Sequence, residues 1–182
     1  MHIAAIVVLL VIIVWGVIAF NRFVRNRNLM REAWSGIDVQ LKRRYDVVPA
    51  LVETVKGYRA HERGLFEDIA EIRARCMGSE AVRERGDAEN ALSRMIRSLF
   101  AVAEAYPDLK ASRNFLDLQR NLTEVEDQIQ FARRYYNGTV RDYNIRVESF
   151  PSMLIAKLCR FGRADFFEIE YATERKAPYI KF

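Results

Sequence analysis

One short pattern in the sequence is typical of zinc enzymes. His61 and Glu62 begin like the HExxH helix motif, in which two histidines one turn apart bind Zn²⁺ and the glutamate acts as a base. Position 65, where the second histidine is needed, is Leu65, and the chain's other histidine is His2. The sequence therefore predicts no zinc site here.

The remaining reactive residue types form no recognisable catalytic pattern. There is no GxSxG motif and no glycine-rich phosphate-binding loop. Cys76 and Cys159 lie far apart, without a CxxC pair, so we expect two small residues on helix faces, although a disulfide is not excluded. The acidic group Glu124, Glu126 and Asp127 lacks a histidine partner and predicts a solvated helix face. We expect no enzyme, and no catalytic, cofactor-binding or metal-binding residues.

A row of polar side chains recurs at steps of three and four residues, which places its members on one side of a helix. This polar row comprises Gln130, Arg134, Asn137, Arg141, Asn144 and Glu148. It runs beside the face that carries Tyr136 and Tyr143. Either these side chains link neighbouring helices and meet water, or they bind a protein or peptide partner.

The first residues of the chain are typical of a membrane-spanning helix. Residues 3–20 are eighteen consecutive residues without a charge or an amide. At about 1.5 Å per residue they extend about 27 Å, close to the thickness of the hydrocarbon layer. A cleaved signal peptide would have a basic start and a shorter apolar run, so we expect residues 1–21 to remain as a transmembrane anchor.

The positive charge of the chain is concentrated directly after this apolar segment. Residues 21–60 contain nine Lys and Arg residues against four Asp and Glu residues. Four of them, Arg22, Arg25, Arg27 and Arg31, are expected to contact anionic lipid head groups, and no nucleic acid partner is expected. Because basic flanks stay on the cytoplasmic side, we expect a single-pass protein of the bacterial inner membrane with its N-terminus outside; export of the soluble part is the alternative.

Residues 22–150 carry a helical repeat of apolar residues and predict an all-α fold, an antiparallel four-helix bundle with long helices. Breaks are expected between Tyr45 and Val48, before Pro49, with Asp46 as an N-cap, and again at the loop from Gly78 to Gly86. A kinked continuous helix is the alternative to the first break.

Three further expectations concern single parts of this domain. Trp34 should be buried against the long last helix. At the Lys42-Arg43-Arg44 cluster we expect a solvated helix end, and a phosphate or partner site is the alternative. Residues 151–182 lose the helical repeat and form an aromatic and charged tail, which we expect to pack on the bundle or on the membrane surface.

Long contiguous strings in the chain resemble the LemA family of bacterial membrane-anchored proteins. They are EAWS at 32–35, IDVQLKRRYD at 37–46, LVETVKGY at 51–58, AEAYPDLKA at 103–111, RRYYN at 133–137, DYN at 142–144 and SFPS at 149–152. The resemblance implies a four-helix bundle on an N-terminal anchor. It carries over no catalytic residues and says little about biochemical role.

The anchor, the helical repeat and the lack of a catalytic pattern favour a membrane-tethered, non-enzymatic scaffold or adaptor of the cell envelope, with the lipid bilayer and a protein as partners. One alternative is an enzyme or enzyme subunit that uses polar groups between helices. Another is a homo-oligomer that self-assembles and remodels the membrane.

Overall fold

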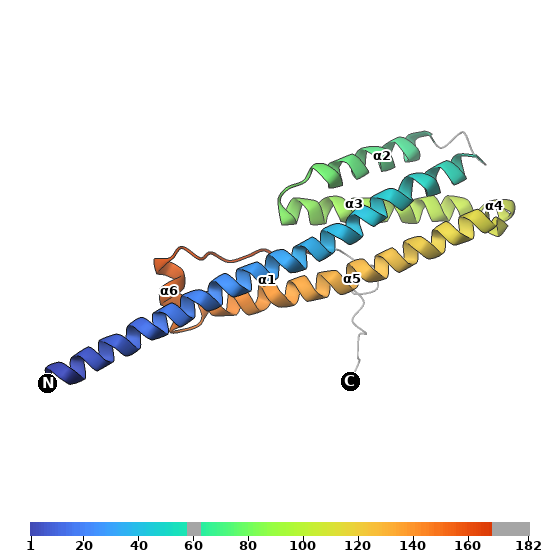
Figure 1. Cartoon of the computed structure of the whole chain (residues 1–182). Helices are drawn as coiled ribbons and strands as arrows, with labels where there is room; N and C mark the ends of the chain where they lie inside the picture. Colours follow the sequence, from blue (N-terminus) through green and yellow to red (C-terminus); the bar gives the residue numbers. More distant parts are fainter. Residues whose placement is uncertain (58–62, 169–182) are drawn as a thin grey trace, which may run out of the picture. The chain divides into compact units, whose positions relative to one another are not determined.

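The computed structural model describes residues 1–57 and 63–168, and every regular element within these ranges is a helix. In chain order they are α1 (His2–Lys56), α2 (Arg63–Gly78), α3 (Val82–Glu104), α4 (Pro107–Ala111), α5 (Arg113–Glu148) and α6 (Ser152–Leu158) (Figure 1). The all-α class is confirmed. The antiparallel four-helix bundle stays a prediction.

Helix α1 continues through the position where the sequence predicted a break. Pro49 lies inside it, and Asp46 caps no new helix, so the predicted break was wrong and the continuous alternative holds. A proline inside a helix costs about 3 kcal/mol or more because it removes a hydrogen bond and crowds the preceding turn. Here Val48, Leu51 and Val55 are all buried around it. Packing of this apolar row therefore outweighs the local preference.

The predicted boundaries of the later helices were partly right. Helix α2 ends at Gly78 as expected, but α3 already begins at Val82, so the predicted loop to Gly86 was wrong. Gly86 is buried within α3, and a Cβ atom there would lie 2.9 Å from the carbonyl oxygen of Glu168. This glycine thus permits a close approach of two segments and does not start a helix. The residues between α3 and α5 include the short helix α4, which begins at Pro107.

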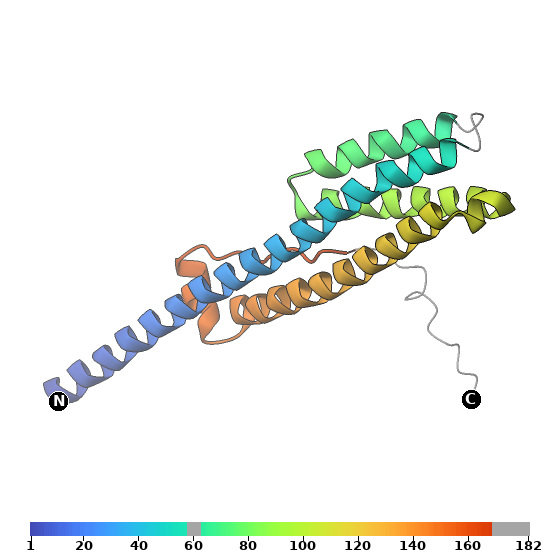
Figure 2. The ribbon, with the colours of Figure 1, turned by 45° about the vertical axis from the view of Figure 1, so that its right-hand side comes forward.

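The chain forms two compact units, and the first consists of residues 1–38 and 131–166. Its core contains Phe23 of α1, Tyr143 of α5 and Ala156 of α6. The Phe23 ring meets the Tyr143 ring edge-on at 6.1 Å between centroids and stacks on Phe161 at 4.9 Å. Both views show α6 beside α1 (Figures 1 and 2). The segment after α5 therefore folds back onto α1.

Trp34 also belongs to this first unit. Its ring centroid lies 5.3 Å from that of Tyr136, so the predicted contact with the long last helix is confirmed. The side chain is half-buried, however, and the expected full burial was wrong.

The second unit consists of residues 39–130 and 167–182, of which 167 and 168 are the described part of the tail. Helices α2 and α3 lie side by side in it (Figure 2). Its core contains Leu41, Leu51, Leu92, Leu99 and Ile129, all 0% exposed. These positions follow the three-and-four spacing of the sequence. The division into residues 1–21, 22–150 and 151–182 remains a sequence-based prediction, and Tyr171, Tyr179 and Phe182 lie outside the described residues.

Candidate functional site

The apolar part of α1 exposes its side chains along most of its length. Residues 3–14 are all exposed. Among the described helices, α1 is the one that is long and apolar enough to cross a membrane. The four arginines of the predicted membrane-surface contact are exposed as well: Arg22, Arg25, Arg27 and Arg31. An apolar helix whose side chains lack protein neighbours needs an apolar solvent, and a lipid bilayer supplies one.

The polar row of α5 does not act as one surface in the structure. Asn144 is buried: its Nδ2 donates to the carbonyl oxygen of Ala164 and its Oδ1 accepts from the Ala164 N–H, both at 2.9 Å. Glu148 forms an ion pair of 3.0 Å with Arg163. Gln130 and Asn137 are half-buried, while Arg134 and Arg141 are exposed. Part of the row therefore holds the segment after α6 in place.

The two exposed arginines of the row lie on a face of α5 that points away from its core. At about 100° per residue, they share one side of the helix with three apolar side chains. These are Phe131, Tyr135 and Ile145, which are 59%, 55% and 53% exposed. The guanidinium of Arg134 lies 4.6 Å from the centroid of the Phe131 ring. We call these five residues, Phe131, Arg134, Tyr135, Arg141 and Ile145, the outward face.

The polar row predicted the two arginines of the outward face but not its apolar members. One signal would have found them: Phe131, Tyr135 and Ile145 are large apolar residues that fall out of phase with the core positions of the same helix. The core positions themselves were predicted correctly, because Ile129, Tyr136, Val140 and Tyr143 are buried. A second apolar row on a helix marks a second contact surface.

A cluster of buried polar groups lies in the second unit, at the side chain of Arg44. The Nη1 atom of Arg44 lies 3.1 Å from Oε2 of Glu89, and both side chains are 0% exposed. The Nη2 atom donates to the Ser93 hydroxyl at 2.7 Å, and Nε lies 3.0 Å from Oε1 of Glu126. The Tyr45 hydroxyl donates to Oε1 of Glu89. The predicted solvated end at Lys42-Arg43-Arg44 was therefore wrong for Arg44, since a counter-charge on α3 draws this side chain into the core.

The electrostatics of this buried cluster disfavour reactivity. Burial raises the pKa of the Glu89 carboxyl, while the Arg44 charge and donors from Tyr45 and Cys76 oppose that rise. Burial and the nearby Glu89 carboxylate raise the pKa of the Cys76 thiol to about 12, and the same two causes raise the pKa of the Tyr45 hydroxyl. A nucleophilic cysteine needs a lowered pKa and access to substrate. Cys76 is 0% exposed and stays a protonated thiol, so the cluster has the properties of a structural element.

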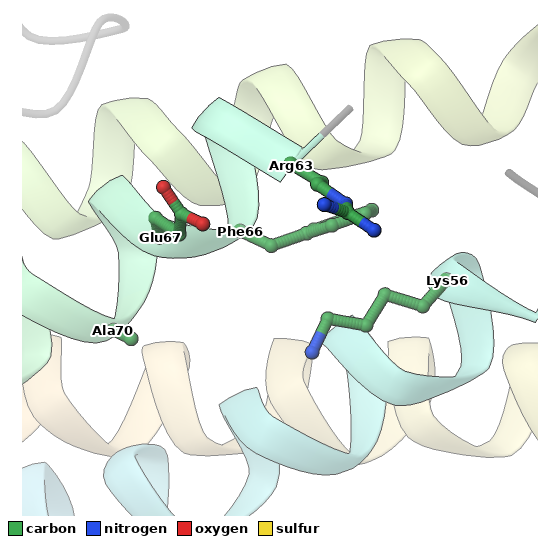
Figure 3. A pocket seen from close by; sticks show the side chains of 5 residues that line it. All are labelled: Lys56, Arg63, Phe66, Glu67 and Ala70. Atoms are coloured by element: carbon green, nitrogen blue, oxygen red, sulfur yellow. The ribbon is translucent and has the colours of Figure 1, made fainter. Parts of the chain in front are cut away.

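A surface opening with a volume of about 470 Å³ lies between the end of α1 and the start of α2. It is lined by Lys56, Arg63, Phe66, Glu67 and Ala70, whose side chains project around it (Figure 3). The Lys56 amine lies 5.7 Å from the centroid of the Phe66 ring. All three charged side chains are exposed. Small-molecule sites orient their ligand with polar groups in a sheltered cavity, and this opening is not of that kind.

The acidic group of α5 also has a structural explanation. Glu126 is half-buried and pairs with Arg44, while Glu124 and Asp127 are exposed. Within residues 1–57 and 63–168, no three His, Cys, Asp or Glu side chains gather in an arrangement that could hold a metal ion. His61 and Glu62 lie outside the described residues.

Comparisons with known proteins give the family of the chain and several relatives. Residues 33–182 match the LemA family. Magnetosome protein MamQ 1 of Paramagnetospirillum magneticum is 25% identical over 88% of this chain and 71% of its own length. Protein LemA of Metamycoplasma hominis is 25% identical over 75% of this chain and 63% of its own length. Magnetosome protein MamQ of Magnetospirillum gryphiswaldense is 21% identical over 81% of this chain and 64% of its own length.

The fold and the exposed apolar helix define the class first: an all-α protein with one N-terminal helix suited to a membrane. The match over residues 33–182 then gives the family, and the chain belongs to the LemA family. The resemblance noted in the sequence is thereby confirmed.

Proposed function

We propose that this protein is a membrane-tethered, non-enzymatic adaptor of the bacterial cell envelope that binds a partner protein through the outward face of α5. Helix α1 holds it in the bilayer, and Arg22, Arg25, Arg27 and Arg31 contact anionic lipid head groups. The observation that carries the proposal is the exposure of Phe131, Tyr135 and Ile145 beside two arginines.

The composition of the outward face fits protein recognition. Tyrosine and arginine are enriched among the residues that dominate binding energies at protein interfaces, since each offers a large contact area and a polar end. Three large apolar side chains on one helix face are costly in water, and a partner that covers them removes this cost. A partner helix with acidic residues would meet Arg134, and also Arg141, which pairs with the exposed Asp142 at 3.2 Å, while its apolar row covers Phe131 and Ile145.

The buried cluster supports a non-enzymatic role. It combines the residue types of an active site, namely an arginine, a glutamate, a tyrosine and a cysteine. Their side chains are closed to solvent, and the Cys76 thiol is held in its unreactive form. The alternative of an enzyme that uses polar groups between helices requires substrate to reach such groups, and a small molecule that copurifies with the full-length protein would favour it.

Photocrosslinking in living cells tests the adaptor proposal. A photoreactive benzoylphenylalanine replaces Tyr135 in the full-length chain, and the matched control carries it at Leu116, another exposed apolar position of α5. We expect one specific heterologous adduct at position 135 and none at 116. Arg134→Glu with Arg141→Glu should weaken that adduct at least about tenfold while the circular dichroism is unchanged. Adducts only between copies of the chain would favour self-assembly, and equal adducts at both positions would refute the outward face as a specific site.

We further propose that the N-terminus faces outward and the helical domain lies in the cytoplasm of the bacterial cell, because the four arginines follow the apolar segment. Glu80 is exposed in the short link between α2 and α3, so Glu80→Cys in a Cys159→Ser background reports the side. A membrane-impermeant maleimide should label it only after spheroplasts are lysed. Replacing the four arginines with glutamate should increase labelling of intact spheroplasts. Efficient labelling of the parent in intact spheroplasts would reverse the topology.

A further inference from the structure

The short helix α6 folds back along the anchor at a level inside its apolar segment. A Cβ atom at Gly16 would lie 3.8 Å from Cδ1 of Ile155, and the Phe20 ring lies 5.7 Å from that of Phe161. Gly16 precedes Phe20, the last residue of the apolar segment, by about one helical turn, or about 6 Å along the axis. When the segment spans a bilayer, α6 lies at the edge of the hydrocarbon layer.

The side of α6 that faces the protein is fixed by its own contacts. Ala156 is 1% exposed in the core with Phe23 and Tyr143, and Ile155 packs against the same group. The Ser152 hydroxyl oxygen lies 2.7 Å from the carbonyl oxygen of Arg146 and 2.9 Å from that of Ser149, and its single hydrogen donates within this pair. These contacts attach the start of α6 to the end of α5. The orientation of α6 about its own axis is therefore set by the fold.

That orientation turns a row of large apolar side chains outward. Leu154 is 50% exposed and Leu158 is 79% exposed, one turn apart on α6, and Phe150, in the turn that precedes the helix, is 77% exposed. In water this is an unfavourable surface. The part of α1 that Ile155 approaches also exposes apolar side chains, since Val17 and Ile18 beside Gly16 are 56% and 48% exposed.

The charges at α6 suit an anionic lipid surface. Lys157, Arg160 and Arg163 are exposed, and the sequence from 149 to 164 contains no Asp or Glu. Lysine and arginine side chains next to an apolar surface extend their charged ends toward lipid phosphates while their stems stay in the apolar layer. Arg163 forms an ion pair with Glu148, whereas Lys157 lies on α6 and Arg160 directly follows it. Apolar residues with basic residues beside them are typical of a helix that lies in the membrane interface.

We propose that α6 is a second membrane contact, in which Phe150, Leu154 and Leu158 enter the acyl-chain layer beside the anchor and Lys157 and Arg160 reach the head groups of anionic lipids. The proposal rests on the insertion of α1 in the bilayer. It fixes the tilt of the first unit relative to the membrane, because a single helix can rotate about its axis and tilt whereas two contacts restrict both movements.

Spin labels on the full-length chain in phosphatidylethanolamine and phosphatidylglycerol vesicles test this contact. Cys159→Ser leaves Cys76, whose buried thiol does not react, and Leu158→Cys then carries the label. Oxygen concentrates in lipid, and a nickel chelate stays in water, so the ratio of their collision rates with the label reports its surroundings. Val14→Cys is the lipid control, and Leu116→Cys, an exposed leucine in the second unit, is the water control.

We expect the label at position 158 to collide with oxygen at least about threefold more often, relative to the nickel chelate, than the label at 116. A ratio at 158 equal to that at 116 overturns the α6 contact while a lipid-like ratio at 14 preserves the anchor. A water-like ratio at 14 refutes the anchor and the α6 contact together. Spectral broadening at 158 that disappears on dilution with unlabelled chains would show that a second copy covers this row, which also overturns the proposal.

Discussion

Removal of the Glu89 carboxylate is the most informative perturbation of the fold. In the folded chain, Glu89 neutralises the charge of Arg44 and accepts a hydrogen bond from the Tyr45 hydroxyl. Both members of the Arg44–Glu89 ion pair are 0% exposed. Glu89→Ala therefore leaves a buried guanidinium without its nearest fully buried counter-charge. Breaking a buried pair in this way costs about 3–5 kcal/mol. Because Glu126 remains 3.0 Å from Arg44 and is 22% exposed, we expect the lower end, about 3 kcal/mol.

This loss is measured on the full-length chain in detergent micelles. Thermal unfolding followed by circular dichroism should show a midpoint lower by about 6–12 °C, since 1 kcal/mol corresponds to about 2–4 °C for a chain of this size. Arg43→Ala is the matched control, because the neighbouring Arg43 is exposed, and it should change the stability by less than about 0.5 kcal/mol. The double variant Arg44→Met with Glu89→Met removes both charges and should lose less than Glu89→Ala. A midpoint for Glu89→Ala within about 2 °C of the parent would refute the structural role of the pair.

Three other predictions follow from single contacts. At pH 8 the folded chain should bind one maleimide, at the exposed Cys159, and a second only after denaturation, because the Cys76 thiol is buried with its pKa raised to about 12; two fast labels would contradict this burial. Trp34→Ala should lower the free energy of unfolding by about 2 kcal/mol, since Trp34 is half-buried and the loss of a fully buried aromatic costs about 3–5 kcal/mol. An unchanged melting midpoint would show that the indole contributes no packing. Gly86→Ala should lower the midpoint despite the gain in helix propensity, whereas Gly36→Ala, with nothing within 4 Å, should raise it; a rise for both would show that the close approach at Gly86 is not tight.

The apolar periodicity of the sequence was sufficient to predict most of the core. On α5, the apolar residues that recur at every third or fourth position from Phe115 to Val147 are all buried or half-buried. The reason is that the helix period is a local property of the backbone, so the spacing of apolar residues identifies the buried side before any partner is known. The apolar segment at residues 3–20 and the sequence motifs that resemble the LemA family could also be identified from the sequence alone.

Local signals failed where distant segments supply the stabilising contact. Pro49 and Gly86 are helix-breaking by propensity, yet one lies in α1 and the other in α3, because the packing of Val48 and Leu51 and the close approach of Glu168 are tertiary effects. Arg44 looked solvated for the same reason. Nothing in residues 42–44 reveals that Glu89 will meet it.

For the candidate functional surfaces too, local sequence predicted some features and tertiary contacts decided the others. The sequence by itself determined the apolar N-terminal segment, the arginines that follow it and the side of α5 that packs inward, since each depends on composition or on helical spacing. The tertiary structure decided which of the other side chains remain open. It turned Asn144 inward to bind the Ala164 backbone, left Arg134 and Arg141 beside Phe131 and Tyr135, and placed α6 against Gly16. Those outcomes depend on which segments fold back onto α1 and α5, and the folding back is set by packing between residues more than one hundred positions apart in the chain, as Phe23 and Phe161 are.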